Sequence, residues 1–204
     1  MDKVKQAQEM GYDRSVGMFS PDGLLLQVEY AEKAVKLGSP SVAMVTKEGV
    51  VFVSDRKIKS RLIVKDSFKK ISEIDNHIAI SGSGVMSDGR RLIEQAQITA
   101  QDHRVKYHSE IDILSLVKDT ANIQQYYSQS GGLRPFGVSL LIGGVEDGDS
   151  VLYQTTPSGV YIKFLARAVG NYSDKINEEL ESSYKDNMTN SEAIKLALFI
   201  YNFL

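Results

Sequence analysis

The stretch SPDGLLLQVEYAEKAVKLGS, residues 20–39, carries the pattern of one amphipathic helix. Its apolar side chains recur at spacings of three and four residues, which places them on one helical face. These side chains are Leu24, Val28, Ala31 and Val35. Ser20 is placed to cap the start of the helix, Pro21 suits its first turn, and Gly38 is placed to end it. The sequence thus predicts a capped helix ahead of the first strands.

Strands and paired helices follow this helix. Residues 41–54 contain two β-rich runs joined by a short turn with glycine, which predicts a hairpin. HIAISGSG, residues 77–84, predicts another strand. A helical pattern runs over roughly residues 87–107, and Ser109 with Asp112 is placed to open a second helix.

Three further strands and two helices complete the pattern. The strands FGVSLLIGGV, SVLYQTT and GVYIKFLA are separated by turns rich in Gly, Asp and Ser, and helices are predicted over roughly residues 173–184 and 190–204. Hairpin connections favour antiparallel sheets, and helices that come in pairs favour outer layers. The order predicts an α+β fold, a four-layer α-β-β-α sandwich of two mainly antiparallel sheets.

The length of the chain, 204 residues, fits a single domain preceded by a short leader. Residues 1–19 are polar and spaced by glycine, which is typical of a mobile or partner-ordered tail. We therefore expect residues 1–20 to be a mobile segment and residues 21–204 to be one four-layer domain.

The composition excludes several classes of function. The formal net charge of −2 argues against a general polyanion binder, so no nucleic-acid partner is expected. The chain contains no cysteine, which excludes disulfides, thiolate catalysis and thiolate metal sites. The polar N-terminal segment lacks the apolar core of a signal peptide, and no apolar run approaches the roughly 20 residues that span a bilayer. We expect a cytoplasmic protein without a membrane partner.

Motifs for metal and phosphate chemistry are weak. Of the histidines, His103 and His108 are five residues apart, the wrong spacing for one helical face, so we expect exposed side chains and no metal site. SGSGVMSDG, residues 81–89, lacks both the third glycine of a dinucleotide loop and the lysine of a Walker loop, which favours a strand-to-helix turn. No cofactor is therefore expected. The enzyme classes left open use a lysine-assisted or an N-terminal nucleophile.

Four blocks carry a resemblance to a known family. They are GYDRSVGMFSPDGLLLQVEYAEKAV (11–35), VFVSDRKIKSRLI (51–63), RPFGVSLLIGG (134–144) and TPSG (156–159). Together they resemble the α-type subunits of proteasomes, most closely the archaeal form, over nearly the whole chain. The resemblance implies the four-layer fold of N-terminal-nucleophile hydrolases. It also implies a seven-membered outer ring of α subunits that controls access to β subunits, where unfolded proteins are cleaved.

The sister β type offers a test of catalysis. Laid on the β-type pattern, Ser39 falls at the place of the threonine nucleophile, Asp55 at its acidic partner and Lys70 at its lysine, while Gly84 falls at the oxyanion-hole position. The nitrogen of Ser39 is a chain amide, however, and cannot serve as the free α-amine base of this chemistry. The resemblance therefore implies a non-catalytic subunit with no catalytic residue of its own.

The resemblance also implies a gate in the leader. Tyr12, Asp13, Pro21 and Tyr30 match the cluster that holds the gate of the family open. Tyr and Asp can hydrogen-bond between neighbouring subunits, and Pro21 can set a rigid reverse turn. Residues 1–11 would then be the gate itself.

A docking pocket for activators is implied as well. Lys70 closes a basic run, residues 56–70, most of which we expect to be a solvated face. It matches the lysine that receives the C-terminal carboxylate of activator ATPases, which one ammonium can bind by charge-assisted hydrogen bonds. Gly84 would line the same pocket, and Glu29 is placed at its rim.

The chain departs from the family at its C-terminal end. Family members add further strands, whereas this sequence stops inside the expected last helix, so we expect a C-terminally short fold with one short sheet and an exposed edge. Two alternatives remain open at this point: a self-processing hydrolase that cuts between Gly38 and Ser39, and a ring-forming scaffold without β partners.

Overall fold

Two antiparallel sheets form the centre of the molecule. The computed structural model describes residues 8–58 and 60–202. The larger sheet has the order β3 (Ile71–Asp75), β4 (Ile78–Gly84), β5 (Val138–Glu146), β6 (Asp149–Thr155) and β7 (Tyr161–Phe164). The smaller sheet has the order β2 (Gly49–Ser54), β1 (Ser41–Thr46) and β8 (Ala166–Val169). Every pairing in both sheets is antiparallel.

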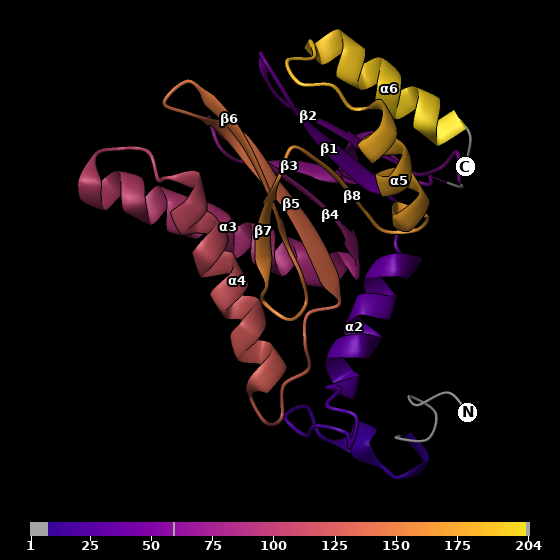
Figure 1. Cartoon of the computed structure of the whole chain (residues 1–204). Helices are drawn as coiled ribbons and strands as arrows, with labels where there is room; N and C mark the ends of the chain where they lie inside the picture. The colour runs from indigo at the N-terminus through magenta and orange to yellow at the C-terminus, as the bar shows by residue number, and fades with distance from the viewer. Residues whose placement is uncertain (1–7, 59, 203–204) are drawn as a thin grey trace.

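Helices cover the outer faces of both sheets (Figure 1). Helices α3 (Met86–Tyr107) and α4 (Ile113–Gln129) pack on the five-stranded sheet, and α5 (Ser173–Ser183) and α6 (Asn190–Asn202) pack on the three-stranded one. Helix α2 (Leu26–Leu37) precedes β1 and packs at one end, against β4 and β5. The predicted four-layer α-β-β-α sandwich is confirmed.

The strands show why the sheets stack. Along β5, Leu140 and Ile142 face α3 and α4, whereas Leu141 between them faces the other sheet. Along β1, Met44 packs under α5 and α6, whereas Ala43 meets the five-stranded sheet. Because successive side chains of a strand point to opposite faces, these two central strands must be apolar on both sides.

Helix α2 begins later than the sequence predicts. It starts at Leu26, and Ser20 does not cap it. Instead, the amide of Gly23 donates to the Ser20 carbonyl at 2.8 Å, and the Ser20 hydroxyl accepts from the Leu24 amide at 3.2 Å. Pro21 at the second position and Gly23 at the fourth suit such a β-turn. Ser20 as a helix cap and Pro21 in the first helical turn were therefore wrong predictions, because the carbonyl and hydroxyl of Ser20 are bonded within the turn. The reverse turn expected at Pro21 is present.

Other boundaries also differ from expectation. Asp112 caps α4, where its carboxylate accepts from the Ser115 amide at 2.8 Å, but Ser109 lies outside the cap. Strand β3 was not predicted, and GVYIKFLA splits at Leu165 into β7 and β8 as the chain crosses between sheets. In the described residues the smaller sheet has three strands, with β2 and β8 at its edges, as expected for a short sheet.

The end of α2 depends on a close approach of two backbones. Gly38 ends the helix as predicted, yet its φ of −69° is open to any residue. What selects glycine is space, because a Cβ atom at position 38 would overlap the Ser83 hydroxyl and the Gly84 amide. The link between α2 and β1 is therefore pressed directly onto the end of β4.

We expect Gly38→Ala to lower the free energy of unfolding by about 1–3 kcal/mol, because overpacked sites must shift backbone or side chains. Gly131→Ala is the matched control, since a Cβ atom there meets no atom within 4 Å. Urea denaturation of both variants measures the difference. Equal stability of the two variants would contradict the close approach.

Candidate functional site

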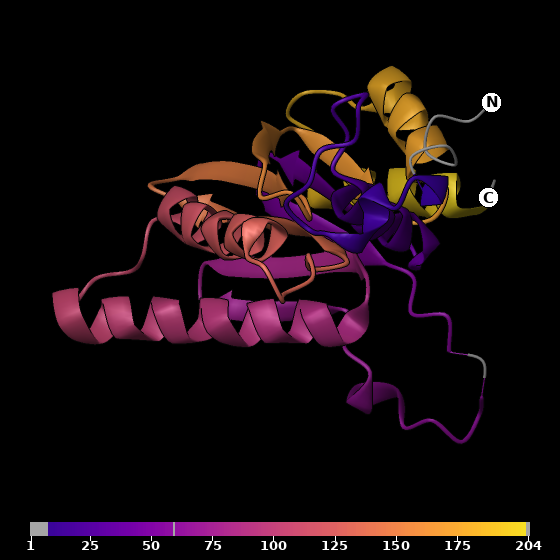
Figure 2. The ribbon, with the colours of Figure 1, turned by 90° about the horizontal axis from the view of Figure 1, so that it is seen from below.

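The centre of the candidate site is the amine of Lys70. The side chain lies just ahead of β3 and is only 5% exposed, whereas neighbouring Lys69 is exposed. Its Nζ donates to the carbonyl oxygens of Ser39 at 2.5 Å and of Pro40 at 3.1 Å. Figure 2 shows the β2–β3 connection projecting away from the body before the chain returns to β3. Among the described lysines and arginines of the basic run, Lys70 is thus the buried one.

The charge of Lys70 is weakened by its surroundings. Burial lowers the pKa of its amine to about 8, the carboxylate of Asp55 opposes this shift, and the nearby charge of Lys57 adds to it. The amine is therefore mostly an ammonium at neutral pH and neutral above pH 8. A lysine whose charge changes so close to neutrality is unusual and marks a candidate functional group.

The four positions that match the β-type catalytic frame lie together around the α2–β1 link. The Ser39 carbonyl accepts from Lys70 and also from the Ser83 hydroxyl at 2.8 Å, next to Gly84. The amide of Asp55 donates to the Pro40 carbonyl at 3.1 Å. The structure therefore brings together the positions that the family resemblance selected.

Ser39 is held as part of a continuous chain. Helix α2 precedes it directly, and the carbonyl of Gly38 accepts from the Asn171 amide at 2.8 Å. The Ser83 hydroxyl also reaches the Val35 carbonyl of α2 at 3.3 Å. The place where a β-type subunit has a free amine is filled here by a packed helix terminus, which leaves a supporting frame without its attacking group.

A buried cluster of serine hydroxyls lies beside this frame and was not predicted from the sequence. Ser41 of β1, Ser54 of β2 and Ser81 of β4 contact one another at 2.8–3.1 Å. The Ser81 hydroxyl also contacts the Lys70 carbonyl at 3.0 Å. These contacts join the two sheets with hydrogen bonds at the edge of an otherwise apolar interface. The only sequence signal was a small polar residue at a strand position expected to be apolar.

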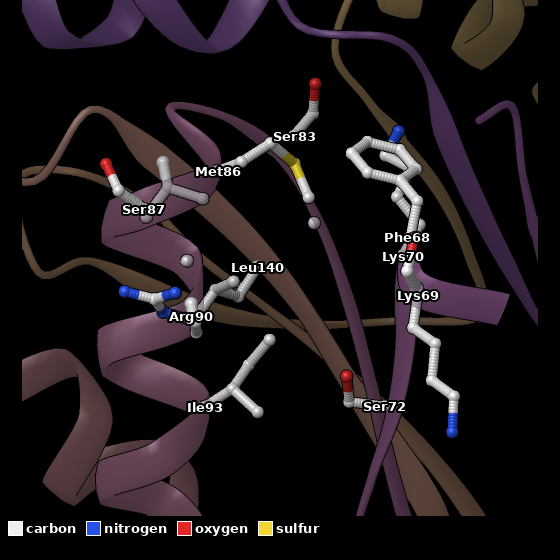
Figure 3. Close-up of a pocket in the computed structure, with 14 residues that line it drawn as sticks. Phe68, Lys69, Lys70, Ser72, Ser83, Met86, Ser87, Arg90, Ile93 and Leu140 are labelled. Atoms are coloured by element: carbon white, nitrogen blue, oxygen red, sulfur yellow. The ribbon is translucent and has the colours of Figure 1, made fainter. Parts of the chain in front are cut away.

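A cavity of about 370 Å³ opens beside Lys70. Its polar lining includes Lys69, Lys70 and Arg90, and its apolar lining comes from Phe68, Met86, Ile93, Val138 and Leu140. Figure 3 shows Ile93 and Met86 reaching from α3 toward the strand that carries Ser72. A second hollow is lined by Arg56, Lys69 and Ile71 together with Lys70. Lys70 therefore lines both hollows.

Of the residues matched to the gate, Tyr30 lies in α2, and Asp13 contacts Gln27 of the same helix. The segment Tyr12–Arg14 forms a short 3-10 helix, and the Gln27 side chain donates to the Asp13 carbonyl at 2.6 Å. The Gln8 side chain donates to the Tyr30 hydroxyl at 2.6 Å. Pro21 is exposed in its turn. Residues 1–7 of the expected gate lie outside the described residues.

Glu29 is not brought to the Lys70 cavity. It lies in the first turn of α2 and is not among the described residues that line the cavity. The pKa of Glu32 is raised, first by the burial of Glu32 itself and second by the negative charge of Glu29. Val35 and Gly38, at the other end of the helix, are the residues beside Ser83. Because an α-helix rises by roughly 1.5 Å per residue, the first turn of α2 with Glu29 lies away from the end that contacts Ser83.

The histidines occupy structural positions. The Nε2 atom of His77 lies 2.9 Å from the Ile111 carbonyl, and His103 is half-buried against the Tyr107 ring at 4.7 Å. His108 is exposed as expected, whereas His103 is not fully so. Within residues 8–58 and 60–202, no cluster of three or more His, Asp or Glu side chains could hold a metal ion.

No helix in the same part of the chain is long and apolar enough to cross a membrane.

Comparison with known proteins matches both parts of the chain. A sequence model of the proteasome subunit family matches residues 35–201, and a model of the N-terminal signature of A-type proteasome subunits matches residues 12–34. The chain is 44% identical over 195 residues to the proteasome α subunit of Methanothermobacter thermautotrophicus, covering 96% of this chain and 79% of that protein. It is 48% identical over 188 residues to the proteasome α subunit of Pyrobaculum aerophilum, covering 92% and 77%. These matches agree with the structure, in which helix α2 directly precedes Ser39 and occupies the nucleophile position. The chain therefore belongs to the proteasome family as one of the archaeal-type α subunits, the non-catalytic class.

Proposed function

We propose that the chain forms the seven-membered outer ring of a proteasome core, gates the access of unfolded proteins with its N-terminal segment, and docks ATPase activators. Its partners are copies of itself or other α subunits, the β subunits that cleave the substrate, and the C-termini of the activators. The observation that carries this proposal is the helix α2 packed where a catalytic subunit needs an open site, with Gly38 pressed against Ser83 and Gly84.

Two contacts support a gate that is anchored on α2. The bond from Gln27 to the Asp13 carbonyl fixes the base of the leader, and the bond from Gln8 to the Tyr30 hydroxyl holds a residue nearer its start. Both donors are neutral amides, and such bonds contribute only about 0.5–1.5 kcal/mol each to stability. A leader held by bonds of this strength can exchange between arrangements with a modest bias.

The surroundings of Lys70 support the docking role. An ammonium has three N–H groups, and two of them are used by the Ser39 and Pro40 carbonyls. No further acceptor for Nζ is found among the described residues, so one donor is left for an incoming carboxylate. The adjoining cavity has an apolar lining that can take up the side chain attached to that carboxylate. Gly84, predicted to line this cavity, is not among its lining residues, although it follows Ser83, which is; Glu29 lies apart in the first turn of α2.

The self-processing alternative loses its basis with the α-type assignment. Cleavage before Ser39 would detach residues 12–34, the part of the chain that matches the α-type signature. A ring without β partners remains a distinct outcome, which co-expression with a β subunit separates from the proposal.

Co-expression with an archaeal β subunit is expected to yield a complex of both chains with peptidase activity, because in the proposed particle the α ring binds the β subunits. Native mass spectrometry measures its composition, and intact mass measures chain length. The isolated α chain is the control and should be inactive and uncut. A seven-membered ring that never retains β subunits would support the scaffold instead, and peptide cleavage by the α chain alone would overturn the proposal.

Deletion of residues 1–11 is expected to speed the degradation of an unfolded protein by the assembled particle several-fold, since the deletion removes the gate. Hydrolysis of a short fluorogenic peptide, which needs less of an opening, should change much less. The ratio of the two rates is the measurement. A deletion that leaves this ratio unchanged would count against gating by the leader.

Docking of a peptide with the C-terminal sequence of an activator should weaken above pH 8. Because the free amine of Lys70 has a pKa of about 8 and a carboxylate prefers the ammonium, binding above that pH requires uptake of a proton. The affinity should then fall by up to about tenfold per pH unit. Fluorescence anisotropy of a labelled peptide measures it on the assembled particle.

Lys70→Met is expected to remove both the binding and its pH dependence, whereas Lys69→Met, one residue away and exposed, should retain both. Normal assembly with β subunits shows that the Lys70 variant is folded. Unchanged peptide affinity in a folded Lys70→Met particle would show that the carboxylate binds elsewhere.

A further inference from the structure

We propose that Lys70 is also a covalent modification site, at which its amine accepts the acyl group of a small acyl phosphate that enters the adjoining cavity. The acceptor chemistry depends only on the cavity and the amine. Its regulatory consequence rests on the proposed docking function.

The cavity suits an anionic acyl donor. Its volume of about 370 Å³ is at the small end of the range of roughly 300–1,000 Å³ that is typical of ligand pockets. The apolar side chains of Ile93, Val138 and Leu140 can receive the acyl chain. Lys69 and Arg90 line the cavity and supply positive charge for a phosphate; the exposed guanidinium of Arg90 also pairs with Glu94 of α3 at 3.6 Å, and none of the described residues that line the cavity is acidic.

The hydrogen bonds of Lys70 orient its amine as a nucleophile, and burial favours the neutral form. A neutral amine has two N–H groups and one lone pair, and the carbonyls of Ser39 and Pro40 accept both N–H groups. The lone pair is then left without a hydrogen-bond donor among the described residues. Burial supports the same chemistry, because it lowers the pKa of Lys70 to about 8 and a desolvated lysine is an activated nucleophile.

The reaction is a simple acyl transfer. The lone pair of the Lys70 amine attacks the carbonyl carbon of the acyl phosphate, and a C–N bond forms. The bond between that carbon and the phosphate oxygen breaks, and phosphate leaves with the electron pair. The nitrogen loses one proton to the departing phosphate or to water, which leaves an amide and no change in oxidation state.

The product would switch off docking. Acylation of a lysine removes its charge, and the amide that remains has one N–H in place of three. A carboxylate at this position would lose its ammonium partner, and the acyl chain would fill part of the cavity. Acylation of Lys70 therefore connects the supply of activated acyl groups to the activator-binding state of the particle.

The test treats the wild-type protein, assembled with β subunits, with millimolar acetyl phosphate and maps the acetylated lysines by peptide mass spectrometry. At pH 8 about half of a group with a pKa of 8 is neutral, against roughly one in 300 for an ordinary lysine. Lower nucleophilicity at lower pKa offsets part of this advantage. We expect Lys70 to react about tenfold faster than its exposed neighbour Lys69, with a rate that levels off above pH 8 while that of Lys69 keeps rising.

A matched variant tests the cavity. Arg90→Gln, at an exposed position of α3 that lines the cavity, should slow acetylation of Lys70 by acetyl phosphate but not by neutral phenyl acetate, since only the former is an anion. Modification of Lys69 at an equal or higher rate than Lys70, or an Arg90 variant that behaves alike toward both reagents, would overturn the proposal. The mass readout needs no activator, so failure of the docking function would appear separately, as acetylation of Lys70 without loss of peptide binding.

Discussion

The buried amine of Lys70, bonded to the carbonyls of Ser39 and Pro40, is the interaction around which the site is organised. It ties the start of β3 in one sheet to the link that leads into β1 of the other. These two hydrogen bonds offset part of the cost of burying the amine, because an unpaired charge in such a place is costly. The α2–β1 link must therefore take the path that presents both carbonyls to Nζ.

That path determines what the site can do. The link brings Gly38 so close to Ser83 and Gly84 that only glycine fits, and it places the packed terminus of α2 where a catalytic subunit would be open. The lysine, the aspartate and the glycine of a hydrolase frame remain in position, but they support a chain segment instead of a nucleophile. In this fold the same geometry anchors the end of a helix, and a cavity of about 370 Å³ opens beside it.

An ion pair between Arg134 and Asp88 secures the start of α3. The guanidinium of Arg134 donates two hydrogen bonds to the Asp88 carboxylate, at 2.6 and 2.7 Å, and the Gly137 amide adds a third at 2.9 Å. Burial acts to raise the pKa of Asp88, but these hydrogen bonds outweigh it and hold the pKa below its usual value. The start of α3 is thereby fixed to the strand entering β5. No local pattern in the sequence indicates this pair, because the two residues lie 46 positions apart.

The sequence by itself determined the layers, the antiparallel connections and the α-type signature, since these depend on periodicity, turn residues and residue order that are local along the chain. It also selected Lys70, Gly84 and the blocked Ser39 through the family resemblance. Only the tertiary structure decided that α2 starts at Leu26, that β3 and β8 exist as separate strands, and that Glu29 lies apart from the Lys70 cavity. It also showed that Lys70 is buried while Lys69 is exposed, and that the hydroxyls of Ser41, Ser54 and Ser81 meet between the sheets. The physical reason is that burial and hydrogen bonding join residues far apart in the chain, which no local pattern of residues can encode.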